Sequence, residues 1–233
     1  MVTVFFVIFV VSAALIVGAL WGVYGTLSDR VEGFIVAMAG GALIMSVIGE
    51  LVEPSLDESN MWFVIVGLAI GATLFTAADY WIDEKSSSDE GTGLLAAVTF
   101  DGVPESLALG VALIGASPAQ VAALAGSILL SNLPEAAGGA KGMKAGGMKP
   151  RNILLLWGGT TVLLALAALV GNLALAGASP HVLATIRCLA AGAVIASLAT
   201  EVFPKAYTED HHLAGIATAL GLIIAVMLES LAG

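Results

Sequence analysis

The sequence has few charged residues, few aromatic residues and a single cysteine. Charged residues occupy 11% of its 233 positions, whereas they make up about a quarter of an ordinary soluble domain. Together with the 59% of hydrophobic residues, this excludes a typical soluble domain and indicates a membrane protein with several spans. The lone Cys188 excludes an intramolecular disulfide. The net charge of −10 argues against a nucleic-acid partner.

The long apolar runs predict an all-α membrane protein that forms one integral domain over residues 1–233. A spanning helix needs about 20 apolar residues. The first run lacks a basic leading region and is too long for a signal peptide, so we interpret it as a membrane helix. We expect eight spans, at residues 3–26, 32–52, 61–81, 93–114, 118–140, 152–175, 183–204 and 213–231.

The basic residues predict an orientation for these eight spans. Seven of the eight Lys and Arg residues fall in connections on one side: Arg30, Lys85, Lys141, Lys144, Lys149, Arg151 and Lys205. Only Arg187 falls on the other side. Because basic connections usually stay in the cytoplasm, we expect a multi-pass protein of the inner cell membrane with both termini outside the cytoplasm.

An internal repeat relates the second expected span to the seventh. Residues 39–52 (AGGALIMSVIGELV) align with residues 190–203 (AAGAVIASLATEVF) at an offset of 151. The matched positions include Gly41 and Gly192, Ser46 and Ser197, and Glu50 and Glu201. Spans two and seven cross in opposite directions, because their ranks differ by an odd number. This predicts an inverted repeat of the 3+2+3 type, in which the first three and the last three spans are related. Transporters with inverted repeats bind their substrate near the membrane midplane, between the repeats. A chance match between apolar segments is the alternative.

Two Pro-Glu motifs lie within neighbouring expected spans: residues 101–105 (DGVPE) and residues 131–135 (SNLPE). An acidic residue at the centre of a membrane helix costs about 3 kcal/mol, so a function normally requires it. Each proline also lacks the N–H that would bond the carbonyl four residues earlier. The oxygen groups suit divalent cations, which predicts a metal site at Asp101, Glu105, Ser131, Asn132 and Glu135. The alternative is that each Pro-Glu pair only kinks and caps a helix.

These motifs resemble those of the ZIP family, the zinc- and iron-regulated transporter-like proteins. The fourth helix of that family carries His-Asn-x-Pro-Glu-Gly, and the fifth carries a His-x-x-Pro-Glu type motif. Residues 39–54 and 190–206 also resemble its second and seventh helices. The resemblance implies a divalent metal transporter that moves zinc, iron or manganese toward the cytoplasm. The metal would be the transported substrate, with no permanently bound cofactor, and a homodimer is implied because the family often dimerises.

The departures from the ZIP pattern affect the expected number of metal sites and the metal that they would prefer. In the resemblance, Glu105 and Glu135 match the metal-binding glutamates, whereas Asp101 and Ser131 stand where the family usually has histidine. Gly102 replaces an asparagine, which removes a ligand of a second metal position, so we expect one metal site. Without imidazole, the set of oxygen ligands suits manganese, iron(II) or magnesium better than zinc.

Several further residues are candidates for a metal pathway. Glu50 and Glu201 occupy mirrored depths and are hypothesised to flank the central site; carboxylates that reach to water are the alternative. Met45 offers a thioether, although packing is the simpler interpretation. His211 and His212, which follow two acidic residues, would hold an arriving metal or belong to a solvated loop.

Other functions remain as alternatives. A proton-coupled carrier of another solute would use the Pro-Glu pairs as proton relays, and a degenerate paralogue would not transport at all. The sequence contains neither HExxH nor GxSxG, so we do not expect an enzyme. The spacing Gly67-x-x-x-Gly71 indicates close helix packing, either inside the chain or at a dimer face.

Overall fold

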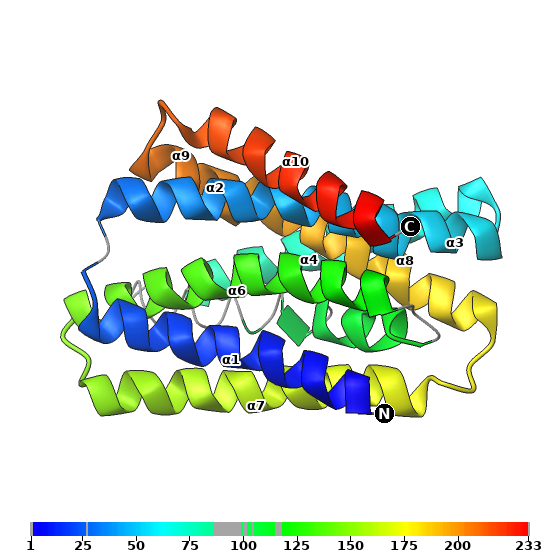
Figure 1. The fold of residues 1–233 in the computed structure, drawn as a ribbon, viewed down its shortest axis with the longest axis horizontal. Coiled ribbons are helices and arrows are strands. Elements are labelled where there is room, and N and C mark those ends of the chain that lie inside the picture. The colour runs from blue at the N-terminus through cyan, green and yellow to red at the C-terminus, as the bar shows by residue number, and fades with distance from the viewer. Residues whose placement is uncertain are drawn as a thin grey trace.

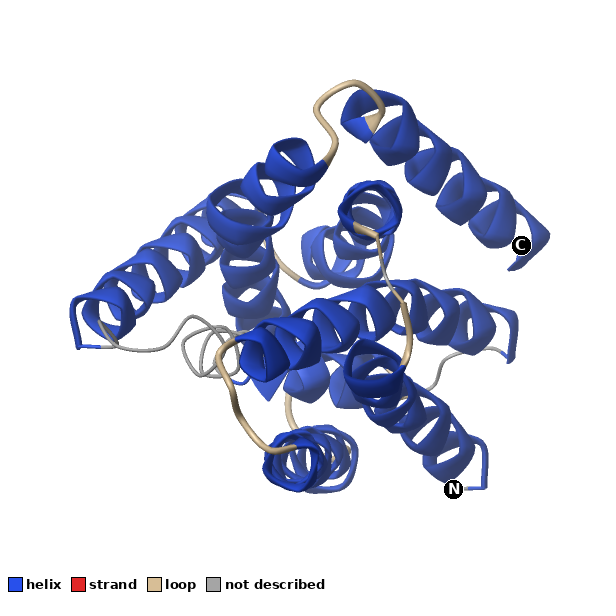
Figure 2. Ribbon diagram, turned by 90° about the vertical axis from the view of Figure 1, so that its left-hand side faces the viewer, coloured by secondary structure: helices blue, strands red, loops and turns tan. Residues whose placement is uncertain are grey.

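The structure, a computed structural model, describes residues 2–26, 28–85, 99, 102–103, 105–114 and 118–232. This part is largely helical and contains no strand (Figure 2). Its elements are α1 (Val2–Tyr24), α2 (Asp29–Ser46), the π-helix η1 (Val47–Val52), α3 (Glu53–Glu58), α4 (Met61–Lys85), α6 (Pro118–Ala145), α7 (Pro150–Ala174), α8 (Pro180–Ser197), the π-helix η2 (Leu198–Val202), α9 (Phe203–Glu209) and α10 (Ala214–Ala232) (Figure 1). Residues 105–112 are also helical.

Among the described residues, five helical segments are long and apolar enough to cross a membrane: Val4–Tyr24, Asp29–Glu58, Met61–Trp81, Pro150–Ala174 and Pro180–Glu209. Ala214–Leu228 is also apolar but shorter. Large apolar side chains on the outer surface of these helices are exposed: Phe9 is 71%, Trp62 75% and Leu155 63% exposed. Apolar surface of this extent is stable in lipid rather than in water. The all-helical, membrane-compatible character expected from composition is therefore present in the described residues.

The described helices pack as two groups. The first, here called the α1 bundle, contains α1, residues 102–114, α6 and α7, and its core joins Leu15, Leu109, Ala140 and Trp157. The second, the α2 bundle, contains α2 to α4 and α8 to α10 with their π-helices, and its core includes Val36. The two bundles meet where α2 and α10 contact α6, and where Ala108 packs into the core of the α2 bundle. Figure 1 shows α2 and α10 above α6, with α1 and α7 below it.

α2 and α8 share the same backbone irregularity. Each runs for 18 residues as an α-helix, passes through a π-helix and continues as a short α-helix with proline in its first turn. In both, a backbone N–H bonds five residues back: Glu53 to Ile48, and Phe203 to Leu198. The expected spans 32–52 and 183–204 are therefore too short, because Pro54 and Pro204 sit in a first helical turn, where proline is tolerated.

Close backbone packing joins α2 to α10 and α8 to α4. In each pair, two glycines face carbonyls of the other helix, and a Cβ atom there would overlap the carbonyl. The glycine–carbonyl pairs are Gly41 with Thr218, Gly221 with Met38, Gly192 with Leu68, and Gly71 with Leu189. Small residues are the usual means of such contact between membrane helices. The spacing Gly67-x-x-x-Gly71 thus serves packing inside the chain, against α8.

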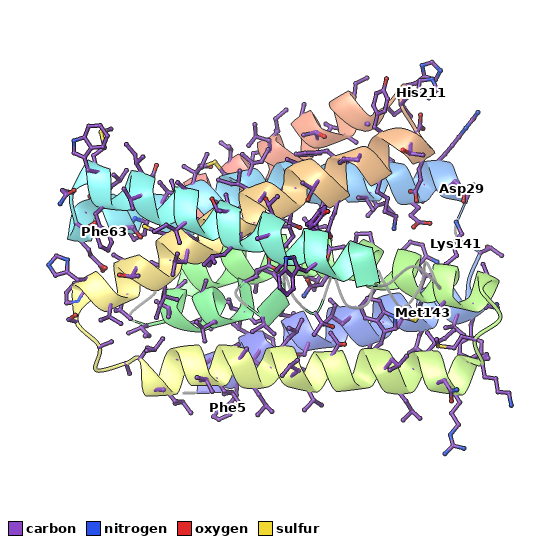
Figure 3. All side chains as sticks on the ribbon, turned by 180° about the vertical axis from the view of Figure 1, so that it is seen from behind. Phe5, Asp29, Phe63, Lys141, Met143 and His211 are labelled. Carbon is purple, nitrogen blue, oxygen red and sulfur yellow. The ribbon has the colours of Figure 1, made fainter. Side chains whose placement is uncertain are left out.

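The helices run along one long axis in alternating directions. α2 and α8 run in opposite senses, as do α4 and α10 (Figure 1). The N- and C-termini lie at the same end of the molecule. Asp29, Lys141 and His211 lie at the opposite end, away from Phe63 (Figure 3). We call the end that carries Lys141 the lysine end.

Candidate functional site

The second Pro-Glu motif lies inside α6, which continues through Pro134. Ser131 and Asn132 are buried, with 1% and 6% exposed, and Glu135 is half-buried. The Ser131 hydroxyl donates to the Ile128 carbonyl at 3.2 Å, which leaves its oxygen lone pairs able to accept or to bind a cation. Because Pro134 has no N–H, it cannot bond the Leu130 carbonyl. One face of α6 thus concentrates oxygen ligands in an apolar setting.

Glu105, from the first Pro-Glu motif, reaches the boundary between the bundles. It is half-buried and lines a cavity of about 20 Å³, room for about one water molecule, together with Ser46 and Leu51 of the α2 bundle and Ile128 of α6. Apart from Glu105 and Ser46, the lining residues are apolar. Ser46, one of the matched repeat positions, was not among the expected ligands. A carboxylate and a hydroxyl therefore meet in a small space that both bundles enclose.

The structure does not bring all the expected ligands together. Asp101 lies outside the described residues, as does Pro104. Within the described ranges, no three or more His, Cys, Asp or Glu residues are grouped so that they could hold a metal ion. His211 and His212 are exposed, and their rings contact each other at a tilt of 43°, with centroids 3.9 Å apart. Glu105 and Glu135 are thus half-buried, whereas the assembly of the expected ligands into one metal centre stays a prediction.

Glu50 and Glu201 both lie in π-helices. Both are half-buried, as is Met45 one turn before Glu50. Because α2 and α8 run in opposite directions, Glu50 lies toward the end with the termini and Glu201 toward the lysine end (Figure 1). π-Helical turns are rare and frequently mark functional sites. The mirrored placement expected from the sequence is therefore accompanied by an unusual backbone at both positions.

A cluster of paired charges lies at the lysine end. The sequence analysis used its two lysines only to predict the orientation and did not identify their acidic partners. Glu32 on α2 is 3% exposed and accepts from two lysines. Lys205 Nζ lies 2.8 Å from its Oε1, and Lys141 Nζ lies 3.0 Å from its Oε2. Lys141 also donates to Asp29 at 2.6 Å. This hydrogen bond, reinforced by Glu32, raises the pKa of Lys141 above its usual value, so its ammonium stays charged at physiological pH.

At the opposite end, an ion pair joins two elements of the α2 bundle. Arg187 on α8 is 7% exposed, and its guanidinium donates to Glu58 at the end of α3 at 2.9 Å. The sequence singled out Arg187 only as the exception to the charge asymmetry. Its partner lies 129 residues earlier, so sequence spacing carried no signal of the pair.

Comparison with known proteins adds no relative: no protein-family model and no curated protein matches this chain. The likeness to ZIP transporters therefore rests on the Pro-Glu motifs and on the matched second and seventh spans.

Proposed function

We propose that this protein is a ZIP-type transporter that carries divalent metal ions across a membrane on the carboxylates of its two Pro-Glu motifs. The observation that carries the proposal is the position of Glu105, a half-buried carboxylate in a cavity that both helix bundles line. Ionisable groups within membrane segments are expensive and usually mark a transport pathway. The other motif, with its buried Ser131 and Asn132, belongs to α6, which also lines this cavity through Ile128.

The proposed metal ligands are Asp101, Glu105, Ser131, Asn132 and Glu135. All of them bind through oxygen, and such a set favours manganese and iron(II) over zinc. The metal is the transported substrate and not a resident cofactor. Because α6 and residues 102–114 both belong to the α1 bundle, the ligands would travel with one rigid group of helices.

The proposed architecture is eight spans with an inverted 3+2+3 repeat. Support comes from the shared π-helices of α2 and α8 and from the glycine contacts. Gly41 and Gly192 are related by the offset of 151, whereas Gly71 and Gly221 are related by 150. The one-residue change falls where η1 has six residues and η2 has five. One consistent alignment thus covers both helix pairs, and the helices that it relates, α2 with α8 and α4 with α10, run in opposite senses (Figure 1).

Transport would proceed by movement of the α1 bundle against the α2 bundle. The cavity at Glu105 lies at their boundary, so such a movement would open it first to one side and then to the other. Glu50 and Glu201 would bind the metal ion transiently on opposite sides of the central site. We propose that the lysine end faces the cytoplasm of a cell with this protein in its inner membrane, and that both termini face outward.

The test is uptake of manganese, iron(II), zinc, cobalt and cadmium into proteoliposomes that contain the purified protein. Glu105→Gln and Glu135→Gln are expected to lower uptake by about tenfold or more, since even outer-shell partners of a metal change affinity by that much. Glu53→Gln is the matched control, because it removes the same charge from an exposed position on α3. Glu50→Gln and Glu201→Gln are expected to give smaller losses.

The outcome separates the alternatives. Uptake that survives both motif substitutions would overturn the proposed site. A folded protein that takes up none of these metals would favour the proton-coupled carrier or the non-transporting paralogue. Thermal unfolding with and without each metal distinguishes these two from a metal binder, because a ligand that binds the folded state raises the unfolding temperature.

A further inference from the structure

The ion pairs at the lysine end differ in which helices they connect. Lys205 on α9 and Glu32 on α2 both belong to the α2 bundle, so their contact stays within one group. Lys141 lies on α6, in the α1 bundle, and reaches Asp29 and Glu32 on α2. Its ammonium therefore ties the two bundles together at this end.

The backbone of α6 also lies close to the Glu32 and Lys205 side chains at these ion pairs. A Cβ atom at Gly138 of α6 would overlap both Glu32 Oε1 and Lys205 Nζ. Ser131 lies two helical turns before Gly138, on the same face of α6. The face of α6 that carries the buried Ser131 thus runs from the proposed metal site toward the lysine end, beneath the ion pairs.

The sharing of Glu32 makes release of Lys141 feasible. Glu32 uses one carboxylate oxygen for each lysine. A buried carboxylate left without any partner is strongly unfavourable. When Lys141 withdraws, however, Lys205 stays with Glu32, because both move with the α2 bundle. Asp29, by contrast, is 78% exposed and exchanges Lys141 for water at little penalty.

We propose that Lys141 is a releasable latch that closes the boundary between the two bundles at the lysine end, with Lys205 holding Glu32 in place while the latch is open. The latch rests on the proposed movement of the bundles and not on the identity of the transported ion. Breaking it would open a path from the lysine end to the face of α6 that carries Ser131.

The test measures access to Ser131→Cys from the lysine end. The background is Cys188→Ala, which removes the buried native thiol, and the probe is a membrane-impermeant maleimide applied to proteoliposomes of defined orientation. Lys141→Gln is expected to raise the labelling rate several-fold from the lysine end and not from the other end. Lys141→Arg is expected to keep the rate of the parent protein.

Two control variants remove a lysine but keep the ion pairs of Lys141 that connect the two bundles. Lys205→Gln breaks the contact with the same Glu32 inside the α2 bundle, and Lys144→Gln breaks a bond from α6 to the Val23 carbonyl inside the α1 bundle. Both are expected to label at the parent rate. Equal acceleration in all three glutamine variants, or none in Lys141→Gln, would overturn the latch.

Thermal unfolding of each variant in detergent shows whether the fold is retained. If Lys141→Gln does not fold, Asp29→Asn weakens the same tie from an exposed position and is expected to raise the labelling rate to a smaller degree. Labelling needs no metal, so a negative result here leaves the uptake experiment intact. Conversely, a protein that transports no metal still tests the latch.

Discussion

The two related helix pairs, α2 with α10 and α8 with α4, share their backbone design but differ in their charges. Both pairs contain a π-helix followed by proline, and both close on glycines that face carbonyls. Their ends, however, are held differently. At the end with the termini, Arg187 and Glu58 join α8 to α3 within the α2 bundle. At the lysine end, Glu32 is bound by one lysine from each bundle.

This difference shows how two helix pairs with the same backbone design become asymmetric. Small residues and prolines determine how the backbones pack, and they recur in both pairs. Glu50 and Glu201 match at the offset of 151, but the charges that form the end pairs do not: Val36 matches Arg187, and Leu183 matches Glu32. The shared backbone features thus give both helix pairs the same close packing, whereas different charge pairs hold the two ends.

The largest effect is expected from the double variant Lys141→Gln/Lys205→Gln. This variant removes both lysines from Glu32, which is only 3% exposed. We expect it to lower the unfolding free energy by about 3 kcal/mol. Each single variant keeps one lysine on Glu32 and is expected to lose much less. The measurement is the thermal unfolding of all three proteins in detergent. Additive losses would show that the two lysines do not share Glu32.

A smaller loss is expected when the glycine packing is disturbed equally in both pairs. Gly41→Ala and Gly192→Ala each place a Cβ atom against a facing carbonyl and are expected to cost about 1–3 kcal/mol. Gly158→Ala is the control, because nothing lies within 4 Å of a Cβ atom there. Thermal unfolding provides the comparison. Tolerance of only one of the two changes would mean that the pairs are not equivalent.

The smallest difference is expected between the two within-bundle ion pairs. Arg187→Gln removes the arginine from Glu58, which is 30% exposed, so we expect a loss of about 1 kcal/mol after allowing for solvent. Lys205→Gln is expected to cost less, because Lys141 still holds Glu32. Unfolding curves of the two variants test this order. A larger loss for Lys205→Gln would show that Lys141 contributes little to Glu32.

Much of the fold was accessible from sequence because membrane helices leave a strong local pattern. The apolar runs predicted the helical class, and the match of 39–52 with 190–203 pointed to the two helices that share a π-helix. The ends of these helices were wrong by up to six residues, because neither the short helix beyond Pro54 nor that beyond Pro204 is apolar enough to extend a predicted span. For the candidate site, the sequence predicted which residues could bind a metal ion but not how they are arranged in space.

The sequence alone determined the helical, membrane-compatible character, the two Pro-Glu motifs and the repeated glycines, because each depends on residues close together in the chain. Only the tertiary structure decided how the helices divide into two bundles and which charges meet. Lys141 lies 109 residues from Glu32, so nothing local links them. Their contact exists because α2 and α6 pack side by side, with Gly138 giving the buried carboxylate the space it needs.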